Sequence, residues 1–176
     1  MGKRSDFERL PRDFYPTPYE AVMPLIPHLL PGTAYIEPCA GNGALIEHLD
    51  RSGLSCLWGV DIEPQWPIAR VGDARTMRYA DSEAEFFITN PPWDRKILHP
   101  IIENLSDQLP TWLLFDADWM HTKQAAPFMD RLRAVVSVGR LKWIPDSKMT
   151  GKDNCCWYLF GKPDPLGSTV FYGRRA

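Results

Sequence analysis

The chain has 176 residues, 44% of them hydrophobic and 24% charged, and a formal net charge of −2. This composition suits one globular domain and argues against long disordered tails. No apolar run reaches the length of a membrane-spanning helix, and the first residues lack the apolar run of a signal peptide, so we expect a cytoplasmic protein with no membrane partner. Because the net charge is slightly negative, a nucleic-acid partner would need a local basic surface.

The four cysteines show no metal-binding spacing. They are Cys39, Cys56, Cys155 and Cys156, with no Cys-x-x-Cys pair and no histidine at zinc spacing from any of them. We interpret them as small buried residues in a reducing compartment and predict no metal site.

The N-terminal part divides into an arm and the start of a domain. Residues 1–13 alternate charges without an apolar period, which predicts a flexible arm, and residues 14–176 are predicted to form a single domain. Thr17 and Pro18 are typical of a helix start, with Thr17 as the N-cap and proline at the first helical position. Apolar residues then recur at helical spacing between 19 and 29, and prolines inside this run predict a short or bent helix.

A strand, a glycine-containing loop and a helix come next. The apolar run 34–36 and the helical spacing at 44–49 predict the first βα unit of a doubly wound sheet. Gly41 and Gly43 between them allow the main chain to approach a ligand closely. Glu37 precedes the glycines, and its carboxylate would repel a pyrophosphate but suit an amino group. This pattern favours S-adenosylmethionine over NAD as the ligand.

An acidic residue follows the second predicted strand. The run 56–60 ends at Asp61, which lies 20 residues after Gly41, the spacing at which a carboxylate accepts hydrogen bonds from ribose hydroxyls. Ile62 is a candidate for the contact with the adenine face, and Glu63 is a second candidate for the hydroxyls.

A brief third strand, 68–71, is predicted to deliver a further carboxylate. Asp73 is placed to accept a hydrogen bond from the amino group of an adenine. The alternative is that Asp73 is the N-cap of a helix from Ala74 to Tyr79, and one residue can serve both purposes.

The fourth strand, 86–89, leads into the sequence Asn90-Pro91-Pro92-Trp93. Proline fixes φ and has no N–H, so the carbonyl groups of this turn are held away from a sheet ladder. The side-chain oxygen of Asn90 and the carbonyl of Pro91 are suited to accept the two protons of an exocyclic amine, with the Trp93 ring against the base. The alternative is an ordinary turn followed by a core tryptophan.

The remaining pattern completes a sheet. Apolar runs at 112–115, 134–138 and 155–160 predict three more strands, and helical spacing occurs at 97–105 and 125–132. We therefore predict an α/β fold with a doubly wound, mostly parallel seven-stranded sheet and helices on both faces. The carboxyl ends of its parallel strands bring the candidate polar residues to one crevice; these are Glu37, Asp61, Asp73 and Asn90.

Basic residues are candidates for a nucleic-acid surface. Arg95 and Lys96 follow the catalytic candidates, and the loop-like segment 140–153 is rich in basic residues, namely Arg140, Lys142, Lys148 and Lys152. An ordinary solvated surface is the alternative interpretation of this loop. We take Trp93, Arg95, Lys96, Lys142, Lys148 and Lys152 as the substrate-binding candidates.

Taken together, these motifs resemble those of the class I S-adenosylmethionine-dependent amino-methyltransferases, and among them the DNA N6-adenine methyltransferases, including small phage or prophage-encoded enzymes. The resemblance implies that Asn90, Pro91, Pro92 and Trp93 are catalytic, with Trp in place of the commoner Tyr or Phe. It implies that S-adenosylmethionine is the cofactor and that the cofactor-binding residues are Tyr15, Thr17, Glu37, Pro38, Cys39, Ala40, Gly41, Gly43, Asp61, Ile62, Asp73, Ala74 and Asn90.

This resemblance implies methyl transfer to the exocyclic N6 of adenine in DNA, with the base flipped out of the duplex. An RNA base or a protein glutamine amide is an alternative substrate, because the same motif occurs in those methyltransferases, and a non-catalytic cofactor-binding module is a second alternative. The chain has no room for a separate target-recognition domain, so sequence specificity would come from the loops 94–100, 116–124 and 141–153. We expect a monomer or a weak homodimer.

Overall fold

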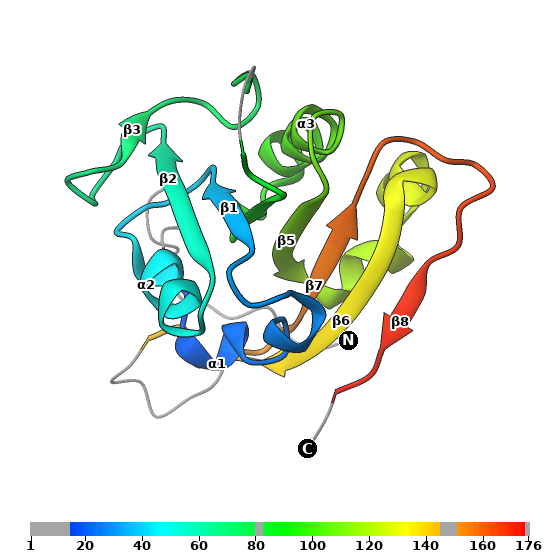
Figure 1. Ribbon diagram of the computed structural model, residues 1–176. Coiled ribbons are helices and arrows are strands. Elements are labelled where there is room, and N and C mark those ends of the chain that lie inside the picture. Colours follow the sequence, from blue (N-terminus) through cyan, green and yellow to red (C-terminus); the bar gives the residue numbers. More distant parts are fainter. Residues whose placement is uncertain (1–14, 80–82, 145–150, 175–176) are drawn as a thin grey trace.

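The computed structural model describes residues 15–79, 83–144 and 151–174 (Figure 1). The predicted arm, residues 1–13, and Lys148 lie outside the described residues. The strands are β1 (Ala34–Glu37), β2 (Ser55–Asp61), β3 (Arg70–Val71), β4 (Phe86–Thr89), β5 (Thr111–Asp116), β6 (Leu132–Arg140), β7 (Asn154–Phe160) and β8 (Val170–Tyr172). They form one sheet in the order β3-β2-β1-β4-β5-β7-β6-β8.

The sheet is mostly parallel, as predicted. Strands β3, β2, β1, β4 and β5 are parallel to one another, whereas β7 is antiparallel to both β5 and β6. All seven predicted strands are present, and β8 is an eighth that the sequence pattern did not predict; it pairs in parallel with β6 at the edge of the sheet. Because β1, β2, β3 and β4 are parallel, their carboxyl ends meet at one edge.

The helices are α1 (Tyr19–Val22), η2 (Ile26–His28), α2 (Ala44–Arg51), α3 (Arg95–Ser106), η3 (Ala117–His121) and η4 (Lys123–Arg131), where η denotes a 3-10 helix. The predicted helix between 19 and 29 is divided into α1 and η2, since Pro24 and Pro27 cannot donate the backbone bonds of a continuous helix. None of the helices in the described ranges is both long and apolar enough to cross a membrane.

Two apolar cores cover the two faces of the sheet. Alternation along β4 sends Phe87 into the core beneath α3 and Ile88 into the core beneath α1 and α2. On the α3 face, Leu98 and Ile102 are fully buried, and burial of each such side chain stabilises the fold by about 1.5–3 kcal/mol. Figure 1 shows α2 and α3 on opposite sides of the sheet. The predicted arrangement with helices on both faces is confirmed.

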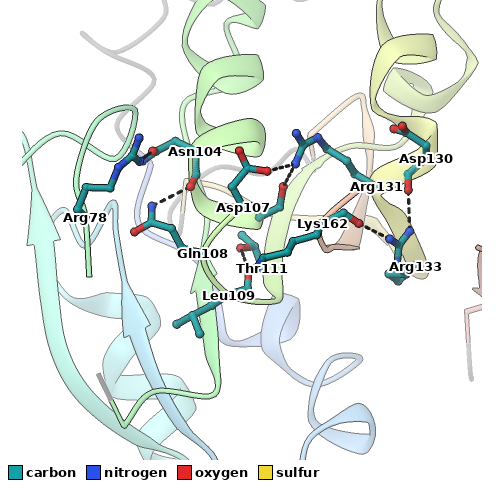
Figure 2. A network of polar contacts seen from close by, with 11 residues as sticks. Arg78, Asn104, Asp107, Gln108, Leu109, Thr111, Asp130, Arg131, Arg133 and Lys162 are labelled. Carbon is teal, nitrogen blue, oxygen red and sulfur yellow. Dashed lines mark hydrogen bonds and ion pairs between the residues drawn. The ribbon is translucent and has the colours of Figure 1, made fainter. Parts of the chain in front are cut away.

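A polar network anchors the chain after β3 to the last turn of α3, and Figure 2 shows its bonds from Arg78 to Asn104 and from Gln108 to Asn104. Asn104 donates from Nδ2 to the carbonyls of Ala74 (2.9 Å) and Met77 (3.1 Å), and its Oδ1 accepts from Arg78. Gln108 adds a bond from Nε2 to the Met77 carbonyl at 3.1 Å. Because Asn104 is 8% exposed, these bonds form in a shielded environment and fix the segment that begins at the sheet edge.

Candidate active site

A cavity of about 630 Å³ opens at the carboxyl ends of β1, β2, β3 and β4. This volume lies in the range of pockets that bind cofactors and drug-sized ligands. Every residue predicted to bind the cofactor lines this cavity except Gly43: these are Tyr15, Thr17, Glu37, Pro38, Cys39, Ala40, Gly41, Asp61, Ile62, Asp73, Ala74 and Asn90. The parallel sheet thus brings together groups that are up to 75 positions apart in the sequence.

A buried carboxyl group stands at the end of β1. Glu37 is 2% exposed, and its Oε2 has no hydrogen-bond partner among the described residues. Burial raises the pKa of this carboxyl well above its ordinary value, and the nearby carboxylates of Asp61 and Asp50 raise it further. A buried polar atom without a partner is costly, so a ligand that brings a hydrogen-bond donor or a positive charge to Glu37 gains that interaction.

The carboxylate of Asp61 is held at the end of β2 by two main-chain groups. Its Oδ2 accepts the N–H of Gly41 at 2.8 Å, and its Oδ1 accepts the N–H of Glu63 at 2.8 Å. The Gly41 carbonyl in turn accepts the N–H groups of Gln65 (3.0 Å) and Trp66 (2.9 Å). These bonds hold the loop after β1 against the loop after β2. They also orient the carboxylate of Asp61, the residue predicted to bind the ribose, on the cavity wall.

Gly43, which was predicted to bind the cofactor, is not among the residues that line the cavity. Its φ is +82°, a conformation that favours glycine, and a Cβ there would lie 2.9 Å from Cγ of Trp66. The same indole covers Gly59, where an added Cβ would lie 3.1 Å from the Trp66 ring. Gly43 therefore admits the Trp66 side chain, and the sequence offered no signal for this contact because Trp66 lies in an irregular loop.

Asp73 lies at the cavity wall just after β3 and is paired with Arg75. Its Oδ2 is 2.6 Å from the Arg75 Nη2, and its Oδ1 accepts the Arg75 main-chain N–H at 2.9 Å. Hydrogen bonding from Arg75 lowers the pKa of Asp73, so this carboxylate is charged at neutral pH. The alternative of a helix over 74–79 was wrong, since the chain forms a turn at 74–76 and no helix follows it over 77–79. Arg75 also lines the cavity and was not anticipated.

The Asn90 amide is bonded at both ends by side chains. Asn90 donates from Nδ2 to Oγ1 of Thr17 at 3.1 Å, and Nε1 of Trp93 donates to Oδ1 of Asn90 at 3.3 Å. The prediction that Thr17 caps the first helix was wrong: the N-cap position is Pro18 and no side chain caps it. Pro92 lines the cavity, whereas Pro91 is buried beside it.

An aromatic group stands next to this turn. The rings of Trp93 and Trp143 are 5.7 Å apart and nearly perpendicular, at 83°, and the ring of Tyr15 is 6.5 Å from that of Trp143. Trp143 was not among the predicted residues. Its signal in the sequence is an aromatic directly after the basic residues Arg140 and Lys142, a combination typical of surfaces that stack and hold nucleic acid.

The predicted basic residues differ in their surroundings. Arg95 is partly buried and forms an ion pair with Asp116 across 3.1 Å, so it is tied to the end of β5. Lys96, Lys142 and Lys152 are exposed. None of these residues lines the cavity. Among the described residues, no group of three or more His, Cys, Asp or Glu side chains could hold a metal ion.

No protein-family model matches the sequence, and the comparison with curated proteins finds no match. Solved methyltransferase structures, however, are similar to this fold. A candidate RNA methyltransferase from Pyrococcus horikoshii has a TM-score of 0.61 and 17% identity, over 92% of this chain and 93% of that one. A dimethyladenosine transferase from Plasmodium falciparum has a TM-score of 0.55 and 13% identity, over 84% and 62%.

A third similar structure is the methyltransferase subunit of a type I restriction-modification system from Streptococcus thermophilus, with a TM-score of 0.57 and 10% identity. The match covers 90% of this chain but 47% of that subunit, so the chain spans about half of its length. With the strand order, these similarities show that the chain has the Rossmann-like fold of class I S-adenosylmethionine-dependent methyltransferases.

Proposed function

We propose that the protein is an S-adenosylmethionine-dependent methyltransferase that acts on the exocyclic N6 of adenine in DNA. The observation that carries this proposal is the Asn90 amide, held by Thr17 and Trp93 at the wall of a cavity of cofactor size. An amide oxygen fixed beside such a cavity is suited to bind an amine at the point where a methyl group is delivered.

The cavity suits the three parts of S-adenosylmethionine. Glu37 would bind the amino group of the methionine part, because it is the buried carboxyl group whose Oε2 needs a donor. Asp61 would bind the ribose hydroxyls, and Asp73, which is a charged acceptor, would bind the adenine amino group. When bound, the cofactor supplies an electrophilic methyl group on its sulfonium.

Two oxygens of the catalytic turn would prepare the target amine. The lone pair of an aromatic amine is conjugated with the ring, which makes it a poor nucleophile. Asn90 Oδ1 and the Pro91 carbonyl would each accept one amine proton and thereby favour a pyramidal nitrogen whose lone pair faces the cavity. In the described part of the chain, no backbone N–H is bonded to the Pro91 carbonyl.

A nucleic-acid substrate is supported by the surface around this turn. Trp93 and Trp143 offer aromatic rings, and stacking contributes about 1–3 kcal/mol per base, which offsets much of the cost of flipping a base out of a duplex. Lys96 and Lys142 are exposed and available to phosphates. The similar structures include a dimethyladenosine transferase and the methyltransferase subunit of a type I restriction-modification system, which supports this class of substrate.

The test is methyl transfer from labelled S-adenosylmethionine to DNA, to RNA of the same sequence and to a protein extract, with Asn90→Ala as the control. Label in DNA that depends on Asn90 supports the proposal. Label confined to RNA or protein would replace the substrate by one of the alternatives. If the protein binds S-adenosylmethionine in calorimetry but transfers no label to DNA, RNA or protein, a non-catalytic binding module is favoured.

A further inference from the structure

The catalytic amide has a fixed orientation that depends on two side chains from distant segments. Trp93 Nε1 donates to Asn90 Oδ1 at 3.3 Å, and Asn90 Nδ2 donates to Thr17 Oγ1 at 3.1 Å. Thr17 precedes α1 and is 73 positions from Asn90, whereas Trp93 is three positions after it. The amide therefore lies between a donor on one side and a hydroxyl on the other.

The two partners have different chemical capacities. The indole Nε1–H of tryptophan can only donate, so it must face the oxygen of the amide, whereas the hydroxyl of Thr17 can either accept or donate. If the amide were rotated by 180°, its –NH₂ group would face the Trp93 N–H, and two donors would meet. Trp93 therefore decides the orientation, and Thr17 completes it. The length of the Trp93 bond matters less than which amide atom can accept it.

Both partners are themselves held in place. Thr17 is 6% exposed and lies between Pro16 and Pro18, which restrict its backbone. Trp93 packs against both apolar cores, and its ring meets that of Trp143 edge-on. A clamp made of restricted side chains limits the rotation of the amide, as a preorganised site requires.

We propose that Trp93 and Thr17 are positioning residues that orient Asn90 so that its side-chain oxygen faces the target amine. The inference rests on the proposed function, because the oriented oxygen has a catalytic purpose only if an amine binds there. It gives Trp93 a role through its N–H group in addition to any stacking by its ring. Consequently, an aromatic residue without this N–H would not replace Trp93.

The first test replaces the Trp93 N–H without changing its shape. Incorporation of 3-benzothienylalanine at position 93 puts sulfur in place of Nε1–H. The expected result is a single-turnover methylation rate about 10- to 100-fold lower, since a small misplacement of a reacting group has this effect. Cofactor affinity is expected to stay within about twofold. The matched control is the same substitution at Trp157, whose Nε1 donates to the Ala21 carbonyl at 2.7 Å outside the cavity; it should affect stability but not the rate.

The second test separates positioning from cofactor binding at Thr17. Thr17→Val keeps the shape and removes the hydroxyl, so the rate at saturating cofactor should fall about tenfold, whereas Thr17→Ser should restore most of it. If Thr17→Val weakens cofactor binding but leaves the saturated rate unchanged, Thr17 only binds cofactor and its positioning role is refuted. An unchanged rate with benzothienylalanine at position 93 would refute the role of Trp93.

A third readout does not depend on activity. In ¹⁵N spectra, the indole N–H resonance of Trp93, assigned with Trp93→Phe, should move when Asn90 is replaced by Leu. It should not move in Asn42→Leu, where the lost side-chain bond is to the Ala44 N–H. If the Trp93 resonance does not shift in Asn90→Leu, the positioning role of Trp93 is refuted even if the protein is an active methyltransferase. A shifted resonance in a protein without methyltransferase activity would support the clamp and refute the proposed function alone.

Discussion

The buried carboxyl group of Glu37 makes the stability of the cofactor-free protein depend on pH. Burial first, and then the charges of Asp61 and Asp50, raise the pKa of Glu37 above its ordinary value of 4.5. Between 4.5 and the raised pKa, the native state therefore holds a proton that the unfolded state has lost. In this window native stability falls as pH rises, by about 1.4 kcal/mol per pH unit.

Glu37→Gln tests this dependence because glutamine has nearly the same shape but does not titrate. For a domain of this size, about 1.4 kcal/mol corresponds to roughly 3–6 °C in Tm. The Tm of Glu37→Gln minus that of the wild type should thus grow by about 3–6 °C per pH unit between 4.5 and the raised pKa, and level off above it. The assay is calorimetric unfolding of both proteins, without cofactor, from pH 4.5 to pH 7.

A constant difference in Tm across this range would refute the reasoning, because it would mean that Glu37 is ionised or fully satisfied in the empty site. The same variant should bind S-adenosylmethionine about tenfold or more weakly at pH 7, since it cannot form a charge-assisted bond with the amino group. A stabilised variant with weakened cofactor binding is the combined result that this site predicts.

Three further substitutions test the framework of the cavity. Asp61→Asn replaces an acceptor of two main-chain N–H groups, so it should lower the free energy of unfolding by about 1–3 kcal/mol in denaturant unfolding. It should also weaken cofactor binding in calorimetry, and an affinity equal to that of the wild type would contradict the role of Asp61. Gly43→Ala should lower the free energy of unfolding more than the control Gly53→Ala. Both glycines have a positive φ, but only at Gly43 would the new Cβ meet Trp66. An equal loss of stability in the two variants would refute the packing argument. Asn104→Leu should cost about 1–3 kcal/mol and increase hydrogen exchange at 74–79, whereas unchanged exchange there would show that Asn104 does not anchor the segment.

Much of the fold was predictable from the sequence because parallel strands buried on both faces form continuous apolar runs. The strand Thr111–Asp116, for example, is buried along almost all of its length, and its apolar run 112–115 predicted it. The strand β8 was missed for the opposite reason. It has three residues, and Val170 and Phe171 are 47% and 61% exposed, so no burial pattern marks it.

The location of the cavity was predictable in the same way, since Glu37 and Asp61 end parallel strands, Asn90 follows one, and the three must meet at one edge. The pairing of side chains within loops was not predictable. The bond between Thr17 and Asn90 joins residues 73 positions apart, and a threonine before a proline fits a helix cap equally well in sequence. Arg75 beside Asp73 likewise depends on a turn conformation that residue types alone do not fix.

The proposed reaction can be measured directly by mass spectrometry of nucleosides from plasmid DNA propagated with this protein in a host that lacks DNA methylation. We expect N6-methyladenine with the wild type and none with Asn90→Ala, while the purified variant retains nearly normal affinity for S-adenosylmethionine. Absence of N6-methyladenine with the wild type, although the purified protein binds the cofactor, would contradict the claim that adenine in DNA is the substrate.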